Sequence, residues 1–95
     1  MISLQLDNDI KDLEELYENA EELIKGGFYK EAIGQLEACL SINNMHVPAY
    51  FGIASIHEKM KNPTNADQFR KLGREIKDRM WYAKVEEEVR KLRGS

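Results

Sequence analysis

The sequence contains little cysteine, proline or glycine. With one cysteine, Cys39, among 95 residues, an intramolecular disulfide is excluded, and a single thiol is typical of a protein from a reducing compartment. Two prolines and six glycines leave few chain breaks, and the β-branched and aromatic clusters that strands favour are missing between them. We therefore expect an all-α chain.

Long apolar runs are also missing. No run approaches the ~18 residues that a membrane span requires, and the first residues lack the basic and apolar regions of a secretion signal. We expect a cytoplasmic protein with no membrane partner. A length of 95 residues fits a single domain.

The net charge of −3 conceals an uneven distribution along the chain. Residues 1–46 carry ten carboxylates and three lysines, whereas residues 47–95 carry seven carboxylates and eleven Lys or Arg. The basic stretch of residues 59–79 includes carboxylates and matches no nucleic-acid motif. An acidic first half and a basic second half are expected, and a nucleic-acid partner is not.

Residues that could carry catalysis or bind a metal are sparse. His46 and His57 are separated by eleven positions, with no Cys, Asp or Glu at metal-ligand spacing. No Ser or Cys lies in a nucleophile motif. The sequence therefore predicts no enzyme, no cofactor and no metal.

Apolar residues recur every three or four positions, as in helices that bury one face. The first helix is expected to start near Asp9, after an irregular segment of residues 1–8, and to end at Gly26-Gly27. A second helix of about fourteen residues follows, up to Ile42. Because the connection is short, the two helices are expected to form an antiparallel hairpin within residues 9–44.

Pro48 and Pro63 indicate the starts of a third and a fourth helix, since proline suits the first helical turn. These helices are expected to form a second hairpin within residues 46–78. From Ile76 to Leu92 no Gly or Pro interrupts the chain, so the fourth helix either stops near residues 77–80 or continues as one long helix. We favour the break, followed by a fifth helix.

Residues 79–95 are expected to be a capping helix and tail, with a polar outer face over the last apolar surface of the two hairpins. The inward residues would be Met80, Trp81, Ala83, Val85, Val89 and Leu92. The alternative is that part of this set is an exposed seam for another copy or another protein. That seam would consist of Trp81, Val85, Val89 and Leu92.

The two hairpins coincide when the chain is shifted by 34 residues. The shift places Ala20 on Ala54 and Ala32 on Ala66. A helix-turn-helix unit of this period resembles the tetratricopeptide repeat (TPR) family. In the first repeat the family's pattern is matched by Leu16, Ala20, Leu23, Gly27, Tyr29, Ala32 and Ile33.

The second repeat departs further from the family pattern. His57 replaces an aromatic residue, Lys61 the turn glycine and Arg70 the aromatic residue of the second helix. The resemblance covers residues 13–78. It implies a short right-handed TPR-like α-solenoid of stacked antiparallel hairpins, with about five helices.

The resemblance also implies a binding site, because the first helices of such repeats line a concave groove that holds a peptide or a helix. The groove residues would be Glu14, Tyr17, Glu21, Ile24, Lys25, Phe51, Ser55, Glu58 and Lys59. Tyr17 and Phe51 would be the anchors. The family's carboxylate clamp is not expected, because Tyr17 and Glu21 stand at its positions.

The implied function is that of a non-enzymatic adaptor or scaffold, and the acidic groove favours a protein or peptide with a basic or amphipathic segment. The alternative is a structural homo-oligomerisation domain in which the C-terminal helix pairs with or swaps into another copy. That alternative arises because two repeats are fewer than the three or so that usually make a stable array.

Overall fold

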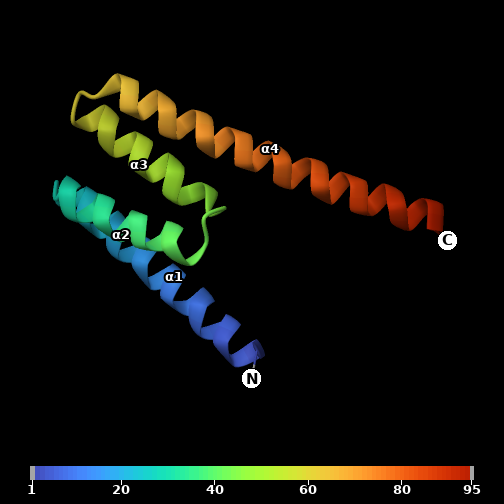
Figure 1. The fold of residues 1–95 in the computed structure, drawn as a ribbon. Coiled ribbons are helices and arrows are strands. Elements are labelled where there is room, and N and C mark those ends of the chain that lie inside the picture. Colours follow the sequence, from blue (N-terminus) through green and yellow to red (C-terminus); the bar gives the residue numbers. More distant parts are fainter. Residues whose placement is uncertain (1, 95) are drawn as a thin grey trace.

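The computed structural model describes the backbone of residues 2–94 and the side chains of residues 11–94. This part of the chain forms four helices and no strand: α1 (Ile2–Lys25), α2 (Tyr29–Ile42), α3 (Val47–Lys59) and α4 (Pro63–Gly94). Figure 1 shows α1 and α2 as one antiparallel hairpin and α3 and α4 as another, with α2 packed on α3 between them. The prediction of an all-α chain is confirmed.

The two hairpins repeat one another at an offset of 34 residues. The first helices end at Lys25 and Lys59, and the second helices begin at Tyr29 and Pro63. Ala20 and its counterpart Ala54 are both buried. The offset found in the sequence is therefore also the offset of the helix boundaries.

The turn of the first hairpin is a Schellman motif, in which backbone N–H groups beyond the helix end donate to its last free carbonyls. The N–H of Phe28 donates to the carbonyl of Leu23 at 2.9 Å, and the N–H of Gly27 donates to that of Ile24 at 3.1 Å. Gly27 has a φ of +82°, which glycine adopts without steric cost.

The turn of the second hairpin has the same hydrogen bonds 34 residues later. The N–H of Asn62 donates to the carbonyl of His57 at 2.7 Å, and the N–H of Lys61 donates to that of Glu58 at 3.0 Å. Lys61 takes the position of Gly27 with a φ of +64°. The turn conformation is thus kept although the glycine is not.

The core lies where α1, α2 and α3 meet, and small residues allow α4 to join it. Its fully buried members are Ala20, Ala32, Leu36, Cys39, Ala49, Ile53 and Ile56. Gly73 of α4 is buried against α3, where a Cβ would lie 3.2 Å from Cζ of Phe51 and 3.3 Å from Cβ of Tyr50. The crossing of α3 and α4 therefore depends on a missing side chain.

The predicted irregular segment of residues 1–8 is wrong in residues 2–8, because α1 begins at Ile2 and not near Asp9. The expected start depends on Asp7, Asn8 and Asp9, which are good N-cap residues. Such residues favour helix ends, but each costs under about 0.7 kcal/mol inside a helix. Since no Gly or Pro stands ahead of them, the helix extends through them.

The predicted break near residues 77–80 is also wrong, because α4 continues to Gly94 without interruption. Only its first half packs on α3, and residues 79–94, here termed the α4 extension, project beyond the body (Figure 1). The radius of gyration is 16.1 Å, against about 12 Å for a compact chain of this length. The capping helix and the fifth helix predicted for this segment are therefore not present.

Candidate binding groove

A groove lies between α1 and α3, the first helices of the two hairpins. Its volume is about 530 Å³. We term it the α1–α3 groove, and it is lined by Tyr17, Glu21, Ile24, Lys25, Pro48, Phe51, Gly52 and Ser55. Apolar side chains form its floor, and Glu21 and Lys25 are exposed at its edge.

Six of the nine residues that the sequence assigns to the groove meet in it: Tyr17, Glu21, Ile24, Lys25, Phe51 and Ser55. They come from α1 and α3, which are separated in the chain by the whole of α2. Pro48 and Gly52 also line the groove and were missed. The sequence indicates Pro48 only as a helix start, although a residue in the first turn of α3 also faces α1.

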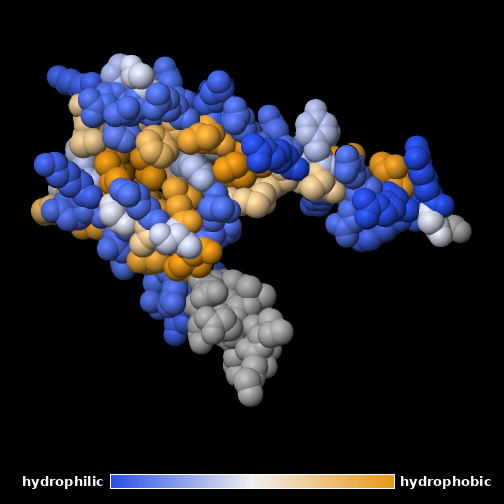
Figure 2. All heavy atoms as spheres, in the orientation of Figure 1, coloured by the Kyte–Doolittle hydropathy of each residue, from blue (hydrophilic) through white to orange (hydrophobic). Residues whose placement is uncertain are grey.

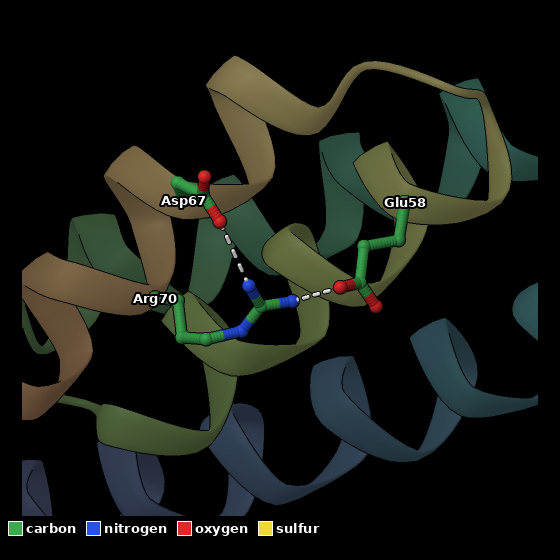
Figure 3. A network of polar contacts seen from close by, with 3 residues as sticks. All are labelled: Glu58, Asp67 and Arg70. Atoms are coloured by element: carbon green, nitrogen blue, oxygen red, sulfur yellow. Dashed lines mark hydrogen bonds and ion pairs between the residues drawn. The ribbon is translucent and has the colours of Figure 1, made fainter.

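The other three residues of that set, Glu14, Glu58 and Lys59, do not line the groove. Glu14 and Lys59 are exposed. The Glu58 carboxylate accepts a hydrogen bond from the guanidinium of Arg70 on α4 (Figure 3). The same guanidinium donates to Asp67 of α4 at 3.0 Å. Through Arg70, the Glu58 side chain therefore links α3 to α4.

Tyr17 is the central side chain of the groove on the α1 side. It is half-buried against the core, and its ring and the His46 ring form a T-shaped pair with a centroid distance of 5.5 Å. Burial raises the pKa of Tyr17, and the nearby Glu21 carboxylate raises it further. The phenol therefore stays neutral, with a carboxylate beside it at the groove edge.

His46 supports Tyr17 from the loop that precedes α3. Its Nδ1 is buried and has no hydrogen-bond partner. Burial lowers the pKa of His46, because an imidazolium would lose hydration there. The neutral ring therefore packs against Tyr17 at physiological pH.

A second groove was not predicted and lies between α2 and α4, with α3 as its floor. Its volume is about 590 Å³. We term it the α2–α4 groove, and it is lined by Ile33, Glu37, Leu40, Ser41, Ile53, His57 and Phe69. Figure 2 shows apolar side chains gathered over the middle of the body, between the two hairpins.

The stacking of His57 on Phe69 gives the α2–α4 groove one of its walls. The two rings are 5.6 Å apart and inclined by 15°. Phe69 thus contributes the aromatic packing of the second hairpin. Arg70, the next residue, instead donates to Asp67 and Glu58.

The seam residues Trp81, Val85, Val89 and Leu92, here termed the α4 stripe, all lie on the α4 extension and are exposed. Trp81 is 58% exposed and contacts the Tyr82 ring edge-on at 5.0 Å. Ala66 and Gly73 define the side of α4 that is buried on α3. At about 100° per residue the stripe is rotated from that side by roughly a third of a turn.

Cys39 is fully buried in α2. Its thiol lies 3.8 Å from the carbonyl oxygen of Leu13, to which it donates. Burial raises the pKa of Cys39, which keeps the group as a thiol at neutral pH. The thiol is thus a contact between α2 and α1.

Neither a metal site nor a membrane span is found among the described residues. No group of three or more His, Cys, Asp or Glu lies close enough in residues 11–94 to hold a metal ion. None of the helices described combines the length and the apolarity needed to cross a bilayer.

Comparison with known proteins gives no assignment. No protein family, curated protein or solved structure matches this chain. Function is therefore inferred from the geometry of the grooves and from the repeat.

Proposed function

We propose that this chain is a non-enzymatic binding module of the TPR type, an adaptor or scaffold that holds a basic or amphipathic segment of another protein in the α1–α3 groove. The single observation that carries the proposal is the meeting of six expected residues in one groove. The repeat register predicts Tyr17, Glu21, Ile24, Lys25, Phe51 and Ser55 as groove residues, and they line one continuous hollow between two helices.

The repeat geometry supports the TPR part of the proposal. Two hairpins with turns of the same hydrogen bonding at an offset of 34 residues are what the family's period requires. Small buried residues stand at equivalent helix crossings in both hairpins, with Ala32 and Ala66 as one such pair. Stacked hairpins of this kind place their first helices along one face, where the α1–α3 groove lies.

The chemistry of the groove supports a basic or amphipathic ligand. Its floor offers Ile24 and Phe51 to apolar side chains, and α1 carries eight carboxylates against two lysines. Exposed charge of one sign steers ligands of the opposite sign and selects against like-charged ones. An amphipathic helix with apolar anchors and Lys or Arg flanks matches both properties.

Two synthetic amphipathic peptides with the same apolar stripe, one flanked by Lys and Arg and the other by Glu, test this proposal. Fluorescence anisotropy should show binding of the basic peptide only, and its affinity should fall as NaCl rises from about 50 mM to about 500 mM. Glu21→Gln should weaken binding about fivefold, because it removes an exposed negative charge next to the bound peptide.

Glu31→Gln is the matched control, since Glu31 is an exposed residue of α2 outside both grooves. It should bind the basic peptide as the unaltered protein does. Equal binding of the two peptides, or a loss of affinity with Glu31→Gln as large as with Glu21→Gln, would contradict a specific acidic groove.

Homo-oligomerisation is the second candidate function, and the exposure of the α4 stripe favours it. Four large apolar residues on one face of a projecting helix form a surface that an isolated protein seldom leaves to water. A role in self-association would use this face as a contact with a second copy.

A further inference from the structure

We propose that the α4 extension of one copy occupies the α1–α3 groove of another, so that the chain assembles through a heterologous contact. This inference rests on the proposed function, since it names a second copy of the chain as the ligand of that groove. It joins an apolar groove bordered by the acidic helix α1 to a projecting helix with a basic balance of charge.

Charge is the first argument for this occupant. The extension carries five Lys or Arg against three Glu, and one of those carboxylates, on Glu87, already pairs with Lys91 at 3.8 Å. The helix that borders the groove, α1, has the opposite balance. Pairing two extensions with each other would instead bring two basic segments together, which costs free energy at low salt.

Size is the second argument. The α4 stripe from Trp81 to Leu92 spans about 16 Å along its helix, at a rise of about 1.5 Å per residue. The groove side of α1, from Tyr17 to Lys25, spans about 12 Å on the same basis. Three successive anchors of the stripe can therefore contact the groove at once, with Trp81 as a large aromatic anchor for its apolar floor.

Connectivity excludes an occupant from the same molecule. α4 is one unbroken helix whose first half is fixed on α3 by Gly73 and Phe69. The extension projects away from the body that holds the groove (Figure 1). It can reach a groove only in another copy, and a contact between two different surfaces closes into a ring or dimer or propagates as a chain.

The test uses the full chain in sedimentation-velocity runs over a range of concentrations, with two single variants. Val85→Asp places a charge in the stripe, and Glu21→Lys reverses a charge at the groove edge; both positions are exposed, so the fold should be kept. Each variant should self-associate at least about tenfold more weakly than the unaltered chain. An equimolar mixture of the two should recover a one-to-one complex, because one retains its groove and the other its stripe.

The controls place the same new side chains outside the two surfaces. Ala83→Asp introduces the charge on the opposite side of the extension, and Glu31→Lys reverses a charge on α2. Both should associate as the unaltered chain does. Trp81 is the only tryptophan, so its emission should shift to shorter wavelength on association and stay unshifted in Val85→Asp.

Three results would overturn the inference: a concentration-independent monomer, self-association that is lost in Val85→Asp but kept in Glu21→Lys, or variants that fail to complement on mixing. The proposed function is separable from it, because Val85→Asp leaves the groove intact. Binding of the basic peptide by a monomeric chain would keep the groove function and reject a second copy as its ligand.

Discussion

At the scale of single residues, the two turns share a left-handed backbone conformation, although only the first turn has glycine at that position. Gly27 and Lys61 occupy equivalent positions with φ values of +82° and +64°. A left-handed conformation costs a residue with a Cβ roughly 1–2 kcal/mol more than it costs glycine. The hydrogen bonds from Lys61 and Asn62 to the end of α3 hold it there.

Lys61→Gly is therefore expected to stabilise the protein by about 0.5–1 kcal/mol, after allowing for the greater freedom of glycine in the unfolded chain. Urea denaturation followed by circular dichroism measures this difference. Lys71→Gly is the matched control, an exposed helical position of α4, and should destabilise by about 1 kcal/mol. A loss of stability in both variants would contradict the left-handed turn at residue 61.

His46 gives the stability a dependence on pH. Burial lowers its pKa below the ordinary value of 6.5, so the unfolded chain binds a proton more readily than the folded one. The neutral ring therefore contributes its full stabilisation at pH values above the pKa of His46 in the unfolded chain. That contribution is lost as the pH falls from there toward the lower pKa of the folded state. Between pH 7.5 and pH 5.5 the unaltered protein should lose stability more steeply than His46→Gln, in denaturation curves at each pH. Parallel pH profiles would contradict this.

At the scale of helices, boundaries marked by Gly or Pro were predictable and the others were not. The turn at Gly26-Gly27 and the starts at Pro48 and Pro63 were placed correctly, because these residues restrict the backbone directly. The start of α1 and the continuity of α4 were not, since both depend on weak helix preferences summed over many residues. The apolar residues of α4 change face along the helix because its environment changes from the contact with α3 to solvent, and the helix continues through that change.

The crossing of α3 over α4 depends on Gly73, and a side chain there should separate the helices. Gly73→Val should destabilise the protein by about 1–3 kcal/mol, as overpacked positions do. Gly34→Ala is the matched control, because nothing lies within 4 Å of a Cβ at that helical position, and it should stabilise by up to about 1 kcal/mol. Chemical denaturation compares them, and a neutral Gly73→Val would contradict the close approach.

The α4 extension should behave differently from the half of α4 that packs on α3. A single helix of about 16 residues without tertiary contacts is marginal in water, so amides of residues 79–94 should exchange at least about tenfold faster than those of residues 66–76 in dilute protein. Hydrogen exchange measured by mass spectrometry resolves the two segments. Equal protection at low concentration would contradict a projecting extension.

At the scale of the whole molecule, the sequence predicted the hairpin repeat and most of one groove, but not the projecting α4 extension. The 34-residue register was sufficient to bring Tyr17 and Phe51 to one hollow, because equivalent helices of successive hairpins face the same way. It could not exclude Glu58, whose pairing with Arg70 depends on a contact between helices. It also missed the α2–α4 groove, which forms from residues of three helices.

The most direct measurement is a heteronuclear NMR titration of Val85→Asp with the basic amphipathic peptide. Binding in the α1–α3 groove predicts chemical-shift changes concentrated there, at Tyr17, Glu21, Ile24, Phe51 and Ser55, with little change at Ile33, Leu40 and Phe69. Changes concentrated at the α2–α4 groove instead, or spread evenly over the surface, would contradict it.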